Sequence, residues 1–286
     1  MAPCGNLPGG DFIEKIMITT RPPAVAGTFY PADPGALAAM VEGFLGERPS
    51  EAKMAVPKAA VPKAIIAPHA GYVYSGPIAG SAFRAVAAAA DAIERVVLVG
   101  PSHYVPIRGL ALPGDPWFST PLGEVRVEAA GAGASLRLPQ VRVIPEAHER
   151  EHSLEVELPF LQALLGEFDL VPLVAGEASA EEVAEVLERL WGGPETLIVI
   201  SSDLSHFLPY DAAQQADRET ARRILALEGS LDPRQACGAV PVNGLMEVAR
   251  RRGLTPELLD LRNSADTAGD PSRVVGYGAF AFHERN

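Results

Sequence analysis

Three stretches decide the fold of this chain: Ala64-Ile65-Ile66-Ala67-Pro68-His69, Val96-Val97-Leu98-Val99-Gly100-Pro101-Ser102-His103 and Leu197-Ile198-Val199-Ile200-Ser201-Ser202-Asp203-Leu204-Ser205-His206. Each begins with about four aliphatic residues and breaks at proline, glycine or serine, which is typical of a buried parallel strand. In open α/β sheets, ligands bind beyond the carboxyl ends of the strands. The three stretches therefore predict one site, at one edge of one sheet, to which each contributes a histidine.

The rest of the chain alternates strand and helix patterns, which predicts a three-layer α/β/α sandwich around a mostly parallel or mixed sheet. We expect helices over 33–44, 78–90, 153–165, 180–190, 211–227 and 242–252. Further strands are expected over 109–112, 124–127, 170–174, 258–261 and 274–282, with 109–127 forming a hairpin-like excursion broken at 116–121. Pro159 should kink its helix or delay its start.

Domain organisation follows from where this patterning stops. Residues 1–20 have no clear period and are predicted to be a loose terminus, followed by one α/β domain over 21–286. Residues 47–62, rich in alanine, proline and lysine, are predicted to be a loop within that domain.

Composition restricts the possible partners. The formal net charge of −12 and the lack of a long basic run argue against nucleic acid. The chain shows no apolar span of membrane length and no secretory signal, so no membrane association is expected. Two cysteines do not make a disulfide framework, and a cytoplasmic location is predicted.

His69 and His103 each follow a predicted strand directly. Neighbouring parallel strands lie about 5 Å apart, so two strand-end histidines can share one metal ion if their strands are adjacent. Taken singly, each could equally be a loop histidine that hydrogen-bonds a carbonyl group. The pair predicts a metal site.

Asp203 and His206 follow the third run at a spacing of three residues, which would place them on one side of a helical turn. Such a carboxylate could orient an imidazole that acts as general acid or base, or both groups could be further ligands. Asp203 could instead only cap a helix, but that would leave His206 unexplained.

The string His148-Glu149-Arg150-Glu151-His152 matches the H-E-x-x-H pattern of zinc proteases. The context does not support that function, because Pro145 precedes it closely and the apolar helical period begins only after His152. We expect His148 to be a solvated loop residue, whereas His152 could line the cleft from the start of a helix.

Cys237 lies in a turn of small residues before a predicted helix. A thiolate there would gain from the field of the helix N-terminus and could bind a borderline or soft metal ion. A lone cysteine among small residues is otherwise more often inert packing.

Taken together, the motifs resemble the Memo family, also called AmmeMemoRadiSam system protein B. The resemblance covers about 21–282 and is carried by Val25-Ala26-Gly27-Thr28-Phe29-Tyr30-Pro31, Pro68-His69-Ala70-Gly71-Tyr72, Gly100-Pro101-Ser102-His103, Glu151-His152-Ser153-Leu154-Glu155, Ser201-Ser202-Asp203-Leu204-Ser205-His206 and Cys237-Gly238. That family is similar to the class III extradiol (LigB-like) dioxygenases, which hold non-haem iron(II) in an α/β fold.

The resemblance implies metal ligands at His69, His103 and Cys237, with Cys237 at the position of a glutamate ligand in the dioxygenases. It implies an acid–base role for His206 and places Asp203 in the vestibule beyond the strand ends. His152 and Tyr72, which belong to its motifs, are further vestibule candidates. Thiolate in place of carboxylate favours copper or zinc, or a different iron chemistry, over the usual iron(II) oxygen chemistry.

Two functions remain open at this point. The protein could be an oxidoreductase that uses iron(II) or copper, with His206 moving a proton. It could instead be a non-catalytic binding protein that holds a peptide, a small molecule or a metal ion on a dioxygenase-like scaffold. The name of the prokaryotic system also implies radical-SAM and AMMECR-type proteins as partners. The sequence does not specify the substrate, the metal or the oligomeric state.

Overall fold

The computed structural model describes residues 19–46 and 61–285. Its helices are α1 (Pro34–Gly46), α2 (Tyr72–Arg84), α3 (Ala129–Ser135), α4 (Glu146–Glu149), α5 (Leu158–Leu165), α6 (Ala180–Leu190), α7 (Tyr210–Leu225) and α8 (Ala239–Arg252), with short 3-10 turns η1 (Ala87–Ala92), η2 (Glu155–Glu157) and η3 (Ser264–Asp266). Its strands are β1 (Thr20–Arg21), β2 (Ala64–Ala67), β3 (Arg95–Pro101), β4 (Leu110–Leu112), β5 (Trp117–Thr120), β6 (Gly123–Val127), β7 (Val141–Val143), β8 (Asp169–Ala175), β9 (Thr196–Ser201), β10 (His206–Leu208), β11 (Thr255–Asn263) and β12 (Val274–His283).

The strands form one mixed sheet. Over the described ranges its order is β1-β5-β6-β8-β3-β9-β2-β12-β10, with β11 paired to β12 and β4 paired to β7 and β8. The central strands β8, β3, β9 and β2 are parallel, whereas β12 runs antiparallel to β2. The carboxyl ends of β2, β3 and β9 therefore lie at the same edge, as the three apolar runs predicted.

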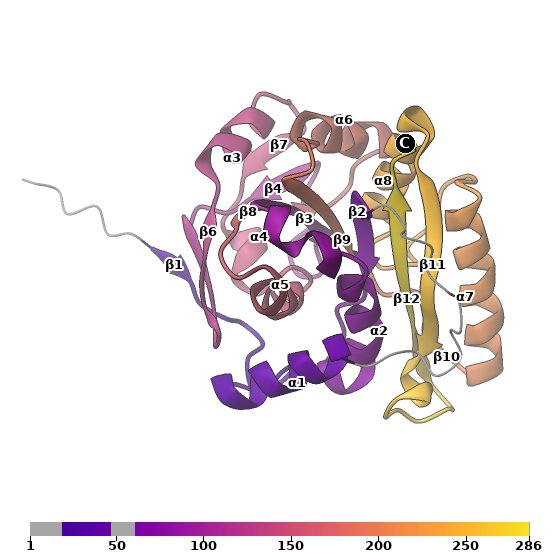
Figure 1. Ribbon diagram of the computed structural model, residues 1–286. Helices are drawn as coiled ribbons and strands as arrows, with labels where there is room; N and C mark the ends of the chain where they lie inside the picture. Colours follow the sequence, from indigo (N-terminus) through magenta and orange to yellow (C-terminus); the bar gives the residue numbers. More distant parts are fainter. Residues whose placement is uncertain (1–18, 47–60, 286) are drawn as a thin grey trace, which may run out of the picture.

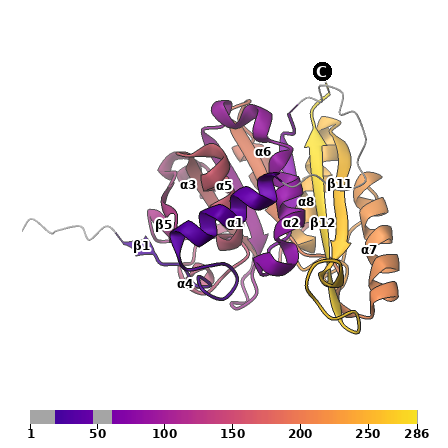
Figure 2. The same ribbon diagram turned by 60° about the horizontal axis from the view of Figure 1, so that its bottom comes forward.

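Helices cover both faces of this sheet, which confirms the predicted α/β sandwich. Alternate residues of each central strand enter different cores: Val96 and Leu98 of β3 pack with α1, α2 and α5, whereas Val97 and Val99 pack with α6 and α8. The two views in Figures 1 and 2 show α1, α2 and α5 together on one side and α7 against the β11–β12 hairpin. Successive residues of a strand point to opposite faces of the sheet, and both faces are covered here by apolar side chains. Every residue of these runs is therefore hydrophobic.

Several predicted elements need correction. The helix expected from residue 78 begins at Tyr72, and Pro77 lies inside it, where its ring removes one backbone hydrogen bond without ending the helix. The stretch 116–121 is not a break: Trp117–Thr120 is strand β5, which forms a hairpin with β6, while Leu110–Leu112 pairs elsewhere. Pro159 does delay its helix, and α5 starts at Leu158.

Helices α1 and α6 each begin at a side-chain cap. The Asp33 carboxylate accepts a hydrogen bond from the Ala36 amide at 2.8 Å, and Ser179 with Glu182 forms a reciprocal capping box. These local signals depend on neighbouring residues alone, so they can be predicted from sequence.

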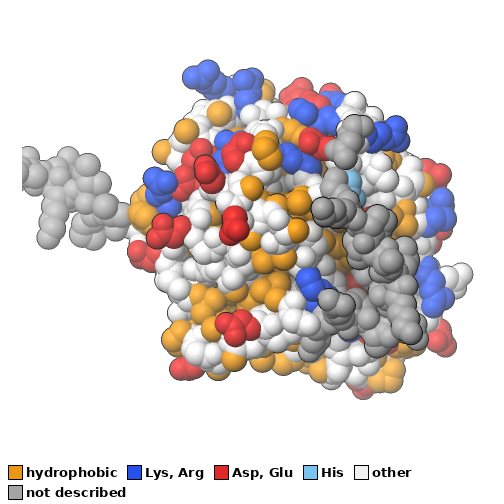
Figure 3. Space-filling view, viewed as in Figure 1, with side chains coloured by type: hydrophobic (Ala, Val, Ile, Leu, Met, Phe, Trp, Pro, Cys, Tyr) orange, Lys and Arg blue, Asp and Glu red, His pale blue; other side chains and the backbone are white. Residues whose placement is uncertain are grey.

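The surface has charges of both signs. Figure 3 shows acidic and basic side chains interspersed around one face, with apolar side chains between them. No helix in the described part of the chain is long and apolar enough to cross a membrane. The predicted loose terminus and most of the predicted 47–62 loop lie outside the described residues, and the prediction of one domain over 21–286 stays a prediction.

Helices α1 and α2 pack so closely that glycine is required at their contact. A methyl group at Gly80 would lie 2.6 Å from the Phe44 carbonyl oxygen, whereas one at Gly43, on the exposed side of α1, would meet no atom within 4 Å. We predict that Gly80→Ala lowers the free energy of unfolding by about 1–3 kcal/mol, because α1 must move away. Gly43→Ala should raise it by about 0.5–1 kcal/mol through helix propensity. Urea titration of both variants checks this, and equal effects would contradict the close packing.

Candidate functional site

His69 and His103 meet at the carboxyl edge of the sheet although their strands are not neighbours. Strand β9 lies between β2 and β3, so the expected adjacency does not hold. The two imidazole centroids are nevertheless 5.2 Å apart, with the rings edge to face. Strand β9 ends at the small residue Ser201, whose hydroxyl contacts the His69 ring.

His69 is buried and held at two points. Its backbone amide donates to Asp203 Oδ1 at 2.9 Å, and its Nδ1 lies 2.7 Å from Ser201 Oγ. The Ser201 hydroxyl donates to Glu157 Oε1 at 2.8 Å, so its oxygen accepts the Nδ1–H of His69. Nε2 is then left with a lone pair, and burial, followed by the charges of neighbouring histidines, lowers the pKa of this imidazole.

His103 is fixed by a buried carboxylate. Glu151 accepts hydrogen bonds from the His103 amide at 2.6 Å and from its Nδ1 at 2.8 Å. Burial alone would raise the pKa of Glu151, but these bonds and the Ser153 amide outweigh it and lower the pKa to about 2. The ionised carboxylate keeps the proton on Nδ1 and leaves Nε2 free, the arrangement common behind metal-binding histidines.

His152 completes a histidine cluster. Its ring stacks on His103 at a centroid distance of 4.7 Å and lies 5.5 Å from His69. The three side chains each offer a ligand atom, and these atoms lie within 4.8 Å of one another, so this histidine-rich site could hold a metal ion. Burial lowers the pKa of His152 to about 4, and its buried Nδ1 has no hydrogen-bond partner.

Cys237 reaches the cluster from the turn before α8. Its Sγ lies 3.3 Å from His69 Nε2 and 3.3 Å from the Asp203 amide nitrogen, which donates to it. Burial and then the charge of Asp203 raise the pKa of the thiol, so without an ion it is protonated. It is not a member of the three-histidine group, but it contacts one of that group's members directly.

The predicted pair Asp203 and His206 is arranged differently from a helical turn. Residues 202–205 are irregular and His206 begins strand β10. His206 Nδ1 bonds the Leu204 carbonyl at 2.8 Å, whereas Asp203 Oδ1 accepts the His69 amide. Backbone, not Asp203, therefore orients this imidazole. Burial raises the pKa of Asp203 to about 7 and lowers the pKa of His206.

A cavity of about 350 Å³ opens beside these groups. His152 and Asp203 line it together with Phe29, Tyr74, Tyr277 and Arg273, among others. Tyr72 is not in its lining: the side chain is buried and its hydroxyl donates to the Val156 carbonyl at 2.8 Å. Tyr72 supports the wall from behind, and the neighbouring Tyr74 is the tyrosine that faces the space.

The carboxylates Glu151, Glu155 and Glu157 are the functional residues that sequence reasoning missed as a group. All three are buried, and each has a separate acceptor role. Glu155 binds Arg21, the Ala24 and Val25 amides and the Tyr30 hydroxyl. The signal in the sequence was three acids within seven residues at the start of the apolar helical pattern, because acids that become buried there require dedicated partners.

The protease pattern is broken in three dimensions. Helix α4 ends at Glu149, so His148 and His152 do not share a helical face. His148 is not a solvated loop residue, as expected from the charged flanks, but is buried with Nε2 2.9 Å from the Ala111 carbonyl oxygen. Glu149 is exposed.

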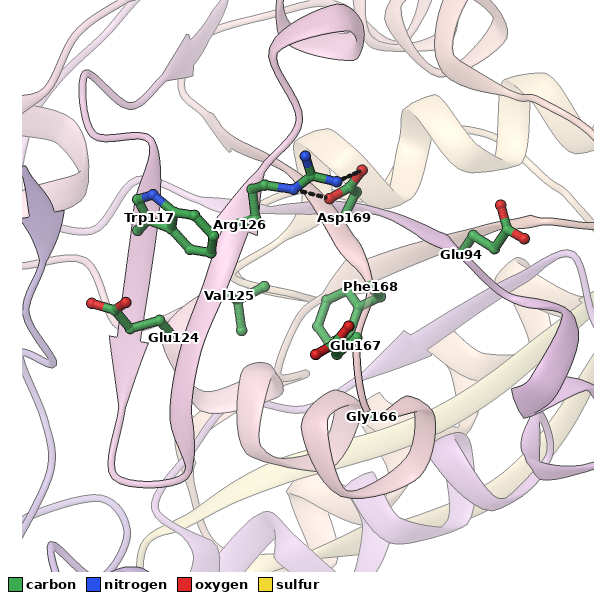
Figure 4. Close-up of a pocket in the computed structure, with 9 residues that line it drawn as sticks. All are labelled: Glu94, Trp117, Glu124, Val125, Arg126, Gly166, Glu167, Phe168 and Asp169. Carbon is green, nitrogen blue, oxygen red and sulfur yellow. Dashed lines mark hydrogen bonds and ion pairs between the residues drawn. The ribbon is translucent and has the colours of Figure 1, made fainter. Parts of the chain in front are cut away.

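A larger cavity, of about 450 Å³, lies at the opposite end of the sheet. Figure 4 shows its lining, with Trp117 beside Arg126 and the latter in a two-bond ion pair with Asp169. It borders the first residue of β8 and the residue before β3, and none of the predicted site residues lines it.

Comparisons with known proteins identify the family of this chain. A family model described as "Memo-like protein" matches residues 21–281. The chain belongs to the Memo family. It is 36% identical to a MEMO1 family protein of Methanopyrus kandleri, over 92% of this chain and 98% of that protein. It is 36% identical to a MEMO1 family protein of Aquifex aeolicus, over 92% of this chain and 98% of that protein. It is 35% identical to one of Archaeoglobus fulgidus, over 92% of this chain and 99% of that protein.

Membership of the Memo family confirms the resemblance inferred from the motifs. The matched region contains every residue of the cluster and the cavity described above. The likeness to extradiol dioxygenases is compatible with the fold but stays a prediction, as do the individual roles of His69, His103, Cys237, His206 and Asp203.

His148 allows a test of its buried position. Burial lowers its pKa from 6.5 to about 4, so between these values the unfolded chain binds a proton that the folded chain does not. The wild-type protein should therefore lose stability relative to His148→Gln as the pH falls from 6.5 to 4. The relative loss should approach about 3 kcal/mol, since one unit of pKa shift is about 1.4 kcal/mol. Parallel denaturation curves at several pH values measure it, and a constant difference would refute the burial.

Proposed function

We propose that this Memo-family protein binds one iron or copper ion through His69, His103 and Cys237, and that it acts as a metal-dependent oxidoreductase on a small molecule. The observation that carries the proposal is the convergence of His69 Nε2 with the other imidazoles and with Cys237 Sγ, 3.3 Å away. These side chains come from three distant parts of the chain.

The donor geometry fits a shared ion. With metal–nitrogen and metal–sulfur bonds of about 2.0 and 2.3 Å, two ligands of one ion lie about 3.1–3.6 Å apart, depending on the angle between them. The distance of 3.3 Å between His69 Nε2 and Cys237 Sγ falls in that interval. Both histidines also have Nδ1 engaged by protein acceptors, which supports coordination through Nε2.

The donor set favours a borderline or soft ion. Two imidazoles and a thiolate suit copper, zinc and iron better than magnesium or calcium. A bound iron or copper ion would supply Lewis acidity and one-electron redox chemistry at this point. In this proposal His152, which lines the cavity, faces the ligand, although one of its ring nitrogens also lies close enough to the other two histidines to serve as a third ligand.

The protein's own residues orient these groups and handle protons. Glu151 holds the His103 ring, and Ser201 with Glu157 holds the His69 ring. His206 has its Nδ1–H on the Leu204 carbonyl, so Nε2 carries a lone pair that can accept a proton. Its lowered pKa keeps it neutral near pH 7, as a general base requires.

Metal content tests the ligand set. We expect about one ion per chain in protein loaded with iron(II) or copper without oxygen, and none retained by His103→Ala or Cys237→Ser after dialysis. Glu151→Gln should weaken binding by about 10–100-fold, since it acts behind the ligand. His152→Ala should retain the ion. His148→Gln is the matched control, because it removes a buried histidine outside the cluster, and it should also retain the ion. Elemental analysis measures the retained metal, and titration measures the binding affinity. Loss in His152→Ala with retention in Cys237→Ser would assign the ion to three histidines instead.

Turnover separates the enzyme from a non-catalytic binding protein. We expect His206→Ala to keep the metal and to bind small ligands in the cavity, but to lose at least about 100-fold in turnover, a usual contribution of general acid–base catalysis. Oxygen consumption beside calorimetric titration measures both properties. Ligand binding without oxygen consumption or product in the wild-type protein would favour the binding protein.

A further inference from the structure

Phe207 has an unusual backbone at the edge of the vestibule. Its φ is +61°, a left-handed conformation that bulky residues rarely adopt. It is the residue at which the β10–β12 register shifts, between His206 paired with Val275 and Leu208 paired with Val274. The bulge turns the ring outward, and the side chain is 58% exposed.

Two costs coincide at this residue. A left-handed non-glycine residue is unfavourable by about 1–3 kcal/mol, and such strain concentrates at functional sites. Exposure also leaves a large apolar ring in water. Glycine would avoid both costs at this position, so the contacts of the phenyl ring are of interest.

The contact on the ring is a cation. The Arg273 guanidinium carbon lies 4.3 Å from the centroid of the Phe207 ring, and the His206 ring lies 5.6 Å from that centroid. Arg273 also lines the 350 Å³ cavity. Its guanidinium group has no hydrogen bond or ion pair to any residue within 19–46 or 61–285. An arginine fork held on an aromatic face with free N–H groups is suited to a planar anion.

The acidic groups nearby already have partners. Asp270, which lines the cavity, accepts the Ser272 amide at 2.8 Å, and Asp203 accepts the His69 amide at 2.9 Å. Neither forms an ion pair with Arg273. In a chain of net charge −12, an arginine that lines a cavity and has no carboxylate partner within 19–46 or 61–285 is an uncompensated positive site.

The walls of the cavity indicate the shape of the ligand. Phe29, Tyr74, Tyr277 and the His152 ring supply flat surfaces, and the volume is at the lower end of small-molecule sites. Aromatic side chains favour stacked or edge-on rings.

We propose that Arg273, held by Phe207, is the specificity-determining residue of this vestibule, and that the ligand is a small organic anion with one planar ring. This inference rests on the proposed function, because it names the class of substrate for the same cavity. The anionic group binds the Arg273 fork, and the ring lies between the aromatic walls near His152 and His206.

Benzoate and its neutral isostere benzamide test the proposal on metal-free protein, by isothermal titration or ligand-observed NMR. Wild type should bind benzoate about tenfold or more tightly than benzamide, as a charge-assisted pair requires. Arg273→Gln should remove this preference. Arg252→Gln is the matched control, because Arg252 stacks on Trp191 at 4.7 Å, remote from the cavity. Phe207→Gly, which suits the left-handed backbone, should keep the fold and reduce the preference.

The outcomes separate this inference from the metal proposal. Equal binding of the two probes by wild type, no binding of either, or the same loss in Arg252→Gln as in Arg273→Gln would overturn it. Metal content is measured independently and should be unchanged in Arg273→Gln. If the metal assay fails while the benzoate preference follows Arg273, the proposed function is lost and the anion site stands.

Discussion

The buried ion pair between Arg21 and Glu155 is the interaction on which the rest of the site depends. The carboxylate accepts from Arg21, from the Ala24 and Val25 amides and from the Tyr30 hydroxyl. Two further Arg21 nitrogens bond the carbonyls of His148 and Glu151. A buried pair is tolerable only when its remaining hydrogen-bonding capacity is satisfied, as here. The pair joins residues 21–30 to residues 148–157.

That segment then positions the cluster. Glu151 orients His103, His152 enters the cluster itself, and Glu157 acts on His69 through Ser201. A single irregular stretch thus supports both strand-end imidazoles from below. Because its carboxylates are buried and hydrogen-bonded to both histidine supports, small shifts in this stretch would misplace both rings together.

The vestibule combines two kinds of surface. On the sheet side lie imidazoles with free Nε2 atoms and a thiol, which suit a metal ion. On the outer side, β10 and the turn before β12 present Phe207 and Arg273, which suit an organic anion. His206 begins β10, the strand that also carries Phe207, and the two rings lie 5.6 Å apart.

The sequence alone determined what depends on local pattern: the buried parallel strands, the capped helices, the α/β class and the histidines at strand ends, together with the family. Tertiary structure decided what depends on distant contacts. Strand order placed β9 between β2 and β3, a backbone carbonyl replaced Asp203 as the partner of His206, and His148 became buried. Such outcomes could not be read from spacing, because they depend on which segments pack together and on the partners that burial demands of each polar group.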